Sequence, residues 1–190
     1  MNRRDFSLAL AAPLSTAKGR IERREGTLIG IDADGVRGVG EATPLPGWTE
    51  SLADCRAALD AVAAEHGTVD GLGDQSDPLV DAPAAVTDAL ADAPAARHAV
   101  EQALLDATGR RRDRSLAGLL AADPATTVPV NATLGDADAE ATVAAARAAV
   151  DSGYSCLKVK VGTGPLDRDV ARLRATREAV GPDVTLRADA

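Results

Sequence analysis

Lysine is the residue whose placement first indicates a catalytic site. The chain of 190 residues has three lysines, Lys18, Lys158 and Lys160, and uses arginine at its other basic positions. Two of them lie two residues apart in Cys-Leu-Lys-Val-Lys-Val-Gly, which alternates like a strand. Strand side chains alternate between faces, so Lys158 and Lys160 are predicted to share one face, roughly 6–7 Å apart. The apolar residues between them then share the other face, which must pack on helices: Leu157, Val159 and Val161.

Two neighbouring ammonium groups favour general-base chemistry. Their mutual repulsion favours the neutral form of one lysine, and a neutral amine is what a general base needs. A divalent cation nearby would favour that form further. The alternative is a solvated strand edge with two surface lysines. The scarcity of lysine elsewhere in the chain favours the functional interpretation.

Asp189 is the candidate partner of the two lysines. It follows Leu186-Arg187-Ala188 at the end of a predicted strand. A carboxylate there suits a hard, oxygen-ligated cation such as Mg²⁺, and the alternative is an N-cap for a following helix. One carboxylate cannot hold Mg²⁺ firmly, so further ligands are expected from beyond residue 190.

Residues 125–190 alternate between strand and helix patterns. Strands are predicted over 127–134, 155–161 and 184–188, and helices over 136–152 and 166–180. This order implies parallel strands with right-handed crossovers, as in the first three β/α units of a (β/α)8-type barrel. Lys158, Lys160 and Asp189 would meet at the C-terminal mouth, where such folds form active sites. A closed barrel takes roughly 200 residues or more, so the chain is expected to be truncated.

Residues 1–124 show a different pattern, and the change predicts a domain boundary between 124 and 125. An antiparallel meander is expected first, with strands over 5–10, 20–32 and 36–41, a loop over 13–19 and a turn at Asp34-Gly35. Helices are then expected over 49–66, 82–92 and 94–108, with Thr49 as the first N-cap, Gly109 as the last C-cap and a loop over 67–78. Trp48 is either a core anchor or a substrate contact.

Charge and composition exclude several classes of protein. Acidic residues outnumber basic ones by 29 to 21, which disfavours nucleic acid and anionic membranes as partners. The acidic surface is halophile-like, or it reflects codon bias and ordinary solubility. No stretch reaches the roughly 18–20 apolar residues of a membrane span, and a cytoplasmic location is expected. Cys55 and Cys156 lack the spacing of a disulfide framework or a zinc site, and the two histidines are too few for a His-rich metal site.

Several of these pieces resemble the enolase superfamily, in its muconate-lactonising subgroup. Lys158-Val159-Lys160 is similar to the Lys-x-Lys of that subgroup's second barrel strand, and Asp189 to the metal ligand that ends its third. The stretch 38–48, Gly-Val-Gly-Glu-Ala-Thr-Pro-Leu-Pro-Gly-Trp, looks like the approach to the capping-domain loop. Its Pro-Leu-Pro-Gly-aromatic run is most like the o-succinylbenzoate synthase group.

The resemblance implies an α+β capping domain over 1–124 and the start of a barrel domain over 125–190. It implies Mg²⁺ at Asp189 and a small carboxylate substrate whose α-proton Lys160 removes, while Lys158 tunes Lys160 and the oxyanion. Loss of hydroxide would then yield o-succinylbenzoate for menaquinone synthesis. Residues of the capping loops would contact the substrate: Ser15, Thr16 and Trp48.

Other interpretations stay open. An N-acylamino-acid racemase or a dipeptide epimerase of the same subgroup would use the same base. A non-catalytic remnant or a binding module is the alternative of another class. The subgroup's further carboxylate ligands and its second lysine have no counterpart here, so the chain by itself is expected to be inactive, and a homo-oligomer is compatible with the sequence.

Overall fold

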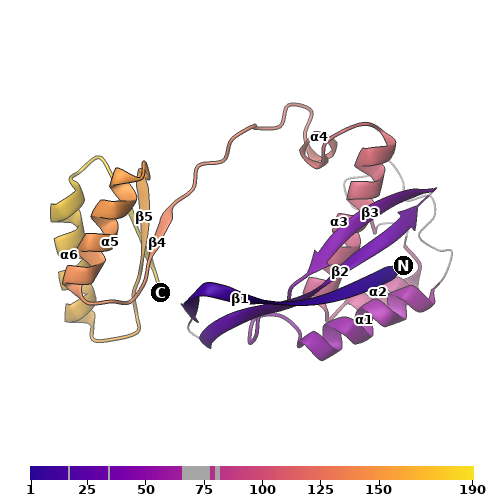
Figure 1. Ribbon diagram of the computed structural model, residues 1–190, viewed down its shortest axis with the longest axis horizontal. Helices are drawn as coiled ribbons and strands as arrows, with labels where there is room; N and C mark the ends of the chain where they lie inside the picture. The colour runs from indigo at the N-terminus through magenta and orange to yellow at the C-terminus, as the bar shows by residue number, and fades with distance from the viewer. Residues whose placement is uncertain (17, 34, 66–77, 80–81) are drawn as a thin grey trace. The chain divides into compact units, whose positions relative to one another are not determined.

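The computed structural model describes residues 1–16, 18–33, 35–65, 78–79 and 82–190. The chain folds into two compact units, Met1–Pro124 and Ala125–Ala190. The first holds an antiparallel sheet with helices, and the second holds a parallel sheet with helices (Figure 1). Each unit has its own hydrophobic core.

Three antiparallel strands open the first unit, in the order β1-β2-β3. β2 (Gly19–Ala33) is one residue longer than predicted at each end, and β3 (Val36–Ala42) is one residue longer at its C-terminal end. β1 runs over Asn2–Thr16, so the loop predicted from Pro13 onward was wrong for its first four residues. Proline is tolerated there because β1 is an edge strand, and its register against β2 shifts between Ala9 and Leu14. At the predicted Asp34-Gly35 turn, Gly35 has a positive φ of 78° and Asp34 lies outside the described residues.

Helix α1 (Leu52–Ala64) begins three residues later than predicted. Ser51, and not Thr49, is its N-cap, because the Ser51 hydroxyl accepts a hydrogen bond from the Asp54 amide at 3.1 Å. The Thr49 hydroxyl accepts instead from the Leu45 amide at 2.8 Å and so stabilises the preceding loop. Most of the loop predicted over 67–78 lies outside the described residues.

Two further helices follow, α2 (Ala84–Leu90) and α3 (Pro94–Arg111), and then a short helix, α4 (Leu116–Leu120). α3 begins at Pro94, as predicted, because proline needs no amide partner in the first turn. The predicted C-cap at Gly109 was wrong, since the helix continues to Arg111. Gly109 is buried, and a Cβ there would lie 2.7 Å from the Arg114 carbonyl oxygen, so the glycine serves close packing.

Close contact between α3 and β3 explains the glycines of the stretch 38–40. A Cβ at Gly38 would overlap the backbone of Ala103, and one at Gly40 would overlap the Ala99 carbonyl oxygen. The helix presents small residues to the strand, and several are fully buried: Ala96, Ala99, Ala103 and Ala107. Glycine on one element and alanine on the other therefore let the two backbones approach closely.

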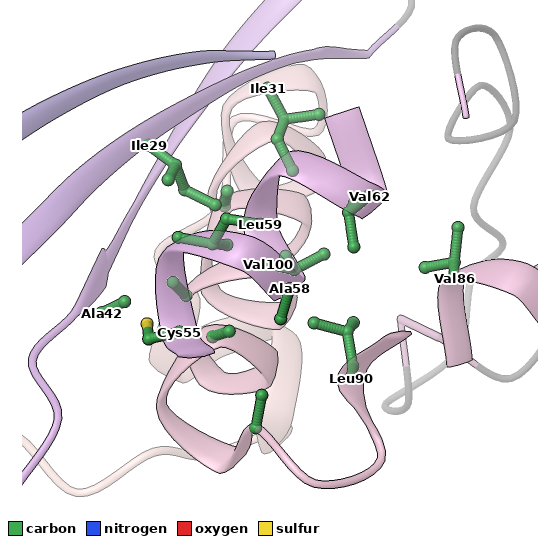
Figure 2. Packing of buried hydrophobic residues seen from close by; sticks show 14 of the residues in the cluster. Ile29, Ile31, Ala42, Cys55, Ala58, Leu59, Val62, Val86, Leu90 and Val100 are labelled. Atoms are coloured by element: carbon green, nitrogen blue, oxygen red, sulfur yellow. The ribbon is translucent and has the colours of Figure 1, made fainter. Parts of the chain in front are cut away.

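The core of the first unit is aliphatic, as the low aromatic content predicts (Figure 2). Ile29 and Ile31 of β2 meet Leu59 and Val62 of α1, and Val100 of α3 completes the contact. Each is at most 3% exposed. Burying such a side chain contributes about 1.5–3 kcal/mol, so this cluster holds the helices on the sheet.

The second unit is a parallel sheet in the order β4-β5-β6 with two helices. Its elements are β4 (Ala132–Leu134), α5 (Ala139–Asp151), β5 (Cys156–Lys160), α6 (Leu166–Val180) and β6 (Thr185–Asp189). β4 is shorter than predicted, because Val128 and Val130 lie exposed ahead of it. α6 matches its predicted range, and the remaining elements differ at their ends by one to three residues.

Candidate active site

Lys158, Lys160 and Asp189 converge at the carboxyl ends of β5 and β6. The Asp189 Oδ2 atom lies 3.3 Å from Lys158 Nζ and 3.1 Å from Lys160 Nζ. Lys160 is the register partner of Asp189 on the adjacent parallel strand. Leu157 and Val159 are fully buried on the opposite face. The predicted convergence of the two amines on the carboxylate is therefore present, and the chemical role of each group stays a prediction.

Both lysines stabilise the ionised form of Asp189. Hydrogen bonds from Lys160, and next from Lys158, hold the pKa of this carboxyl below its usual value. About a third of each of the three side chains is exposed, so solvent reaches the cluster. Asp189 is consequently an anionic oxygen donor at neutral pH, which is the form that a hard cation requires.

The described residues offer one candidate ligand for a magnesium site. Mg²⁺ prefers six oxygen ligands in octahedral geometry, some of them water, and Asp189 provides a carboxylate of the right chemistry. Across the part of the chain that the structure describes, no group of three or more His, Cys, Asp or Glu side chains lies close enough to hold a metal. Asp189 thus fits as a single ligand, and these residues alone do not form a complete magnesium site.

A buried polar network beneath the lysines was not predicted from the sequence. Arg172 of α6 is fully buried and forms an ion pair with Asp169 at 2.9 Å. The guanidinium also donates to the Lys160 carbonyl oxygen at 2.9 Å, and Asp169 accepts from the Gly162 amide at 2.8 Å. The Asp-x-x-Arg spacing is the one signal that could have revealed the pair.

Asp169 should make the stability of this unit depend on acid pH. The Gly162 amide, and next the Arg172 guanidinium, hold the pKa of the Asp169 carboxyl below its usual value in the folded state. Its contribution to folding is therefore present above the unfolded pKa of about 3.9 and is lost as the pH falls through the lower folded pKa. Asp169→Asn should lower the free energy of unfolding at pH 7, and the gap to wild type should narrow toward pH 3.

Urea unfolding, followed by the amide signals of β5 at a series of pH values, measures this gap. Asp167→Asn is the matched control, because Asp167 lies exposed in the first turn of the same helix. A gap for Asp169→Asn that stays constant between pH 7 and pH 3 would contradict the prediction.

The candidate substrate contacts of the first unit lie at one end of its sheet. The Trp48 side chain is 58% exposed, so the core-anchor alternative was wrong. Lys18 Nζ lies 5.6 Å from the centroid of the Trp48 ring, within the range of a cation–π contact. The Thr16 hydroxyl donates to the Gly19 carbonyl oxygen at 2.8 Å and so closes the turn between β1 and β2.

This end of the sheet brings Trp48 beside the turn that follows Thr16. Ser15 pairs with Arg20 across the β1–β2 ladder, and its side chain lies outside the described residues. These three candidates belong to the first unit, whereas the lysines and Asp189 belong to the second. Their role as substrate contacts stays a prediction.

Comparison with known families places the chain. Residues 3–121 match the N-terminal domain of the mandelate racemase / muconate lactonizing enzyme family, and residues 141–190 match the enolase C-terminal domain-like family. The fold and the sequence together therefore define a chain of the enolase superfamily. It belongs to the mandelate racemase / muconate lactonizing enzyme family.

The curated proteins to which the chain is similar differ in their activities. The chain is 32% identical to the hydrophobic dipeptide epimerase of Enterococcus faecalis, over 98% of this chain and 51% of that protein. It is 27% identical to the o-succinylbenzoate synthase of Desulfotalea psychrophila, over 98% of this chain and 56% of that protein. The chain spans about half the length of these relatives.

Solved structures show the same likeness. A mandelate racemase/muconate lactonizing protein from Herpetosiphon aurantiacus superposes with a TM-score of 0.85 at 27% identity, over 99% of this chain and 51% of that one. The dipeptide epimerase of Enterococcus faecalis, in complex with Mg and the dipeptide L-Leu-L-Tyr, gives a TM-score of 0.81 at 28% identity, over 100% and 52%. Among the described residues of our chain, no helix is long and apolar enough to cross a membrane.

Proposed function

We propose that this chain supplies the general base, and one metal ligand, of an enzyme that removes a proton from the carbon next to a carboxylate. The observation that carries the proposal is the convergence of Lys158 and Lys160 on Asp189 at the carboxyl ends of two parallel strands. Active sites of (β/α)8 barrels form at that end of the strands. The activity is proposed for the full-length protein that contains these residues.

Lys160 is the proposed base. It is the last residue of β5, and its Nζ atom lies 3.1 Å from Asp189 Oδ2. Lys158, two residues earlier on the same face, places a second positive charge beside it. This charge would stabilise the negative charge that develops on the substrate carboxylate during proton removal.

Asp189 is the proposed metal ligand, together with oxygen ligands from outside the described residues. Bound Mg²⁺ would make the α-proton more acidic by drawing charge from the substrate carboxylate. Within this chain, Asp189 would stay ionised and orient both amines. Its contacts with Lys158 and Lys160 keep the pKa of the carboxyl low and hold the two side chains beside it.

Two reactions are candidates for this base. The first is dehydration to o-succinylbenzoate in menaquinone biosynthesis, as the Pro-Leu-Pro-Gly-Trp stretch suggests. The second is racemisation or epimerisation of an N-acylamino acid or a dipeptide. The similarity to a hydrophobic dipeptide epimerase and to the N-succinyl-L-Arg/Lys racemase of Bacillus cereus (33% identical over 50% of this chain and 26% of that protein) favours the second.

An exchange experiment in D₂O tests the proposal and separates the two reactions. The full-length protein is incubated with Mg²⁺ and either dipeptides or N-succinyl amino acids, and proton NMR follows the α-proton signal. A parallel assay follows the absorbance of o-succinylbenzoate formed from its cyclohexadiene precursor. Loss of the α-proton signal identifies the racemase or epimerase, and formation of the aromatic product identifies the synthase.

EDTA is the control for the metal in both assays and is expected to abolish turnover. If a folded full-length protein with Mg²⁺ neither exchanges the α-proton of any of these substrates nor forms the aromatic product, the catalytic proposal fails. A non-catalytic remnant or a binding module would then be the better interpretation.

A further inference from the structure

We infer that Arg172 is a positioning residue for Lys160. Its guanidinium fixes the backbone at the end of β5 and thereby sets the direction in which the Lys160 side chain leaves the strand. The catalytic part of this inference rests on the proposed function, whereas its structural part, the anchoring of the strand end, does not.

The Arg172 guanidinium contacts the ends of two adjacent strands. Its Nη1 atom donates to the carbonyl oxygen of Lys160, the last residue of β5, at 2.9 Å. Its Nη2 atom donates to the carbonyl oxygen of Gly135, the residue that follows β4. Arginine suits this position because its planar fork presents several donors in fixed directions.

The remaining contacts hold the guanidinium itself in place. Nη1 also donates to Asp169 Oδ1 at 2.9 Å, and Nε donates to the Thr142 hydroxyl of α5 at 3.3 Å. Arg172 is 0% exposed and Asp169 is 4% exposed, so neither side chain is free to take another orientation in water. The network therefore ties both helices to the strand ends.

Three consecutive backbone groups at the end of β5 are anchored. The Lys160 carbonyl accepts from Arg172, the Val161 amide donates to the Asp189 carbonyl at 2.9 Å, and the Gly162 amide donates to Asp169 Oδ2 at 2.8 Å. Gly162 has a φ of 86°, which lets the chain turn away directly after these bonds. These hydrogen bonds hold the backbone at Lys160 in place and join the end of β5 to the backbone of Asp189.

Placement of this network at the lysine end of the sheet indicates more than a role in stability. A buried ion pair is often no more stabilising than apolar residues of similar volume. The buried charge of Arg172 is therefore better explained by the strand-end carbonyls that its guanidinium holds. Arg177 of the same helix provides the contrast. It donates to the Gly181 carbonyl and, at 2.8 Å, to the Val184 carbonyl, just ahead of β6 at the opposite end of the sheet.

Arg172→Lys and Arg177→Lys form a matched pair of variants in the full-length protein. Each retains a positive charge and loses the fork that contacts backbone carbonyls. Arg172→Lys is expected to lower kcat by about 100-fold, because a displacement of the base by about 1 Å costs that much. KM should change by less than about threefold, since substrate binding is not the function of this contact.

Arg177→Lys is expected to leave kcat within about twofold of wild type, although it removes similar backbone hydrogen bonds. Both rates are normalised to the folded fraction measured by circular dichroism. An equal loss of kcat in the two variants after normalisation would overturn the inference, because it would reduce Arg172 to a residue that only stabilises the fold.

Amide hydrogen exchange tests the structural part without turnover. The Gly162 and Val161 amides should lose protection in Arg172→Lys and keep it in Arg177→Lys, and unchanged protection in both variants would overturn the inference. If the wild-type protein shows no turnover at all, the proposed function fails. Hydrogen exchange at Val161 and Gly162 then decides by itself whether Arg172 anchors the end of β5. If Arg172→Lys does not fold, Asp169→Ala replaces it: alanine has no oxygen to accept from the Gly162 amide, so the same loss of Gly162 protection is expected.

Discussion

Replacing Lys160 with alanine in the full-length protein is expected to slow proton abstraction by about 10²–10⁴-fold, the usual contribution of a positioned general base. The fold should survive, because the Lys160 side chain is 30% exposed and lies outside the apolar core. Arg172 contacts Lys160 through its carbonyl oxygen, and alanine keeps that bond. Exchange of the substrate α-proton in D₂O measures the rate, and circular dichroism checks the fold.

Lys160→Arg separates the base from its charge. Arginine keeps a positive charge beside Asp189 but does not become neutral in proteins, so it cannot accept the proton. This variant should be as slow as Lys160→Ala, and Arg174→Ala, which removes an exposed cation from α6, should stay near wild type. If Lys160→Ala exchanges the α-proton at a rate within tenfold of wild type, Lys160 is not the base. If Lys160→Arg does so, Lys160 contributes only its positive charge.

The second large effect concerns the first unit. Gly40→Ala should lower its free energy of unfolding by about 1–3 kcal/mol, the usual cost of inserting a methyl group where space is lacking. The added Cβ would overlap the Ala99 carbonyl oxygen of α3, and a helix backbone cannot move aside as a side chain can. Either α3 must shift from β3 or the strand must distort. Urea unfolding, followed by circular dichroism, measures the change.

Gly30→Ala is the matched control in the neighbouring strand β2. The added Cβ there would meet the Asn2 side chain, which is near the start of the chain and can rotate away. Its effect should stay within about 1 kcal/mol, because alanine also restricts the unfolded chain. Equal stabilities of Gly40→Ala and wild type would show that the contact between α3 and β3 adapts.

The second unit was largely predictable from the sequence. Its strands and helices alternate, and the strand period of two is enough to place Lys158 and Lys160 on one face. The parallel order then brings the ends of β5 and β6 together, so the meeting of the lysines with Asp189 follows. Short-range pattern and strand topology determine this part of the candidate site.

The remaining features depend on contacts that a linear pattern does not contain. Thr49 and Ser51 are both residue types that cap helices. The hydrogen bond from the Leu45 amide occupies the Thr49 hydroxyl, and Ser51 caps the helix. An arginine on a helix is usually exposed, so nothing local marked Arg172 as buried. The extension of β1 past Pro13 depends on its place at the edge of the sheet.

The unequal surroundings of the two cysteines make the chain convenient for spectroscopy. Cys55 is 0% exposed in the first core, and burial, with the nearby Glu50 carboxylate, raises the pKa of its thiol to about 12. Such a thiol does not react at neutral pH. Cys156 is half-buried and shares a face of β5 with Lys158 and Lys160. A maleimide fluorophore would therefore attach to the natural sequence at one place, beside the two amines, and would report whatever covers that face.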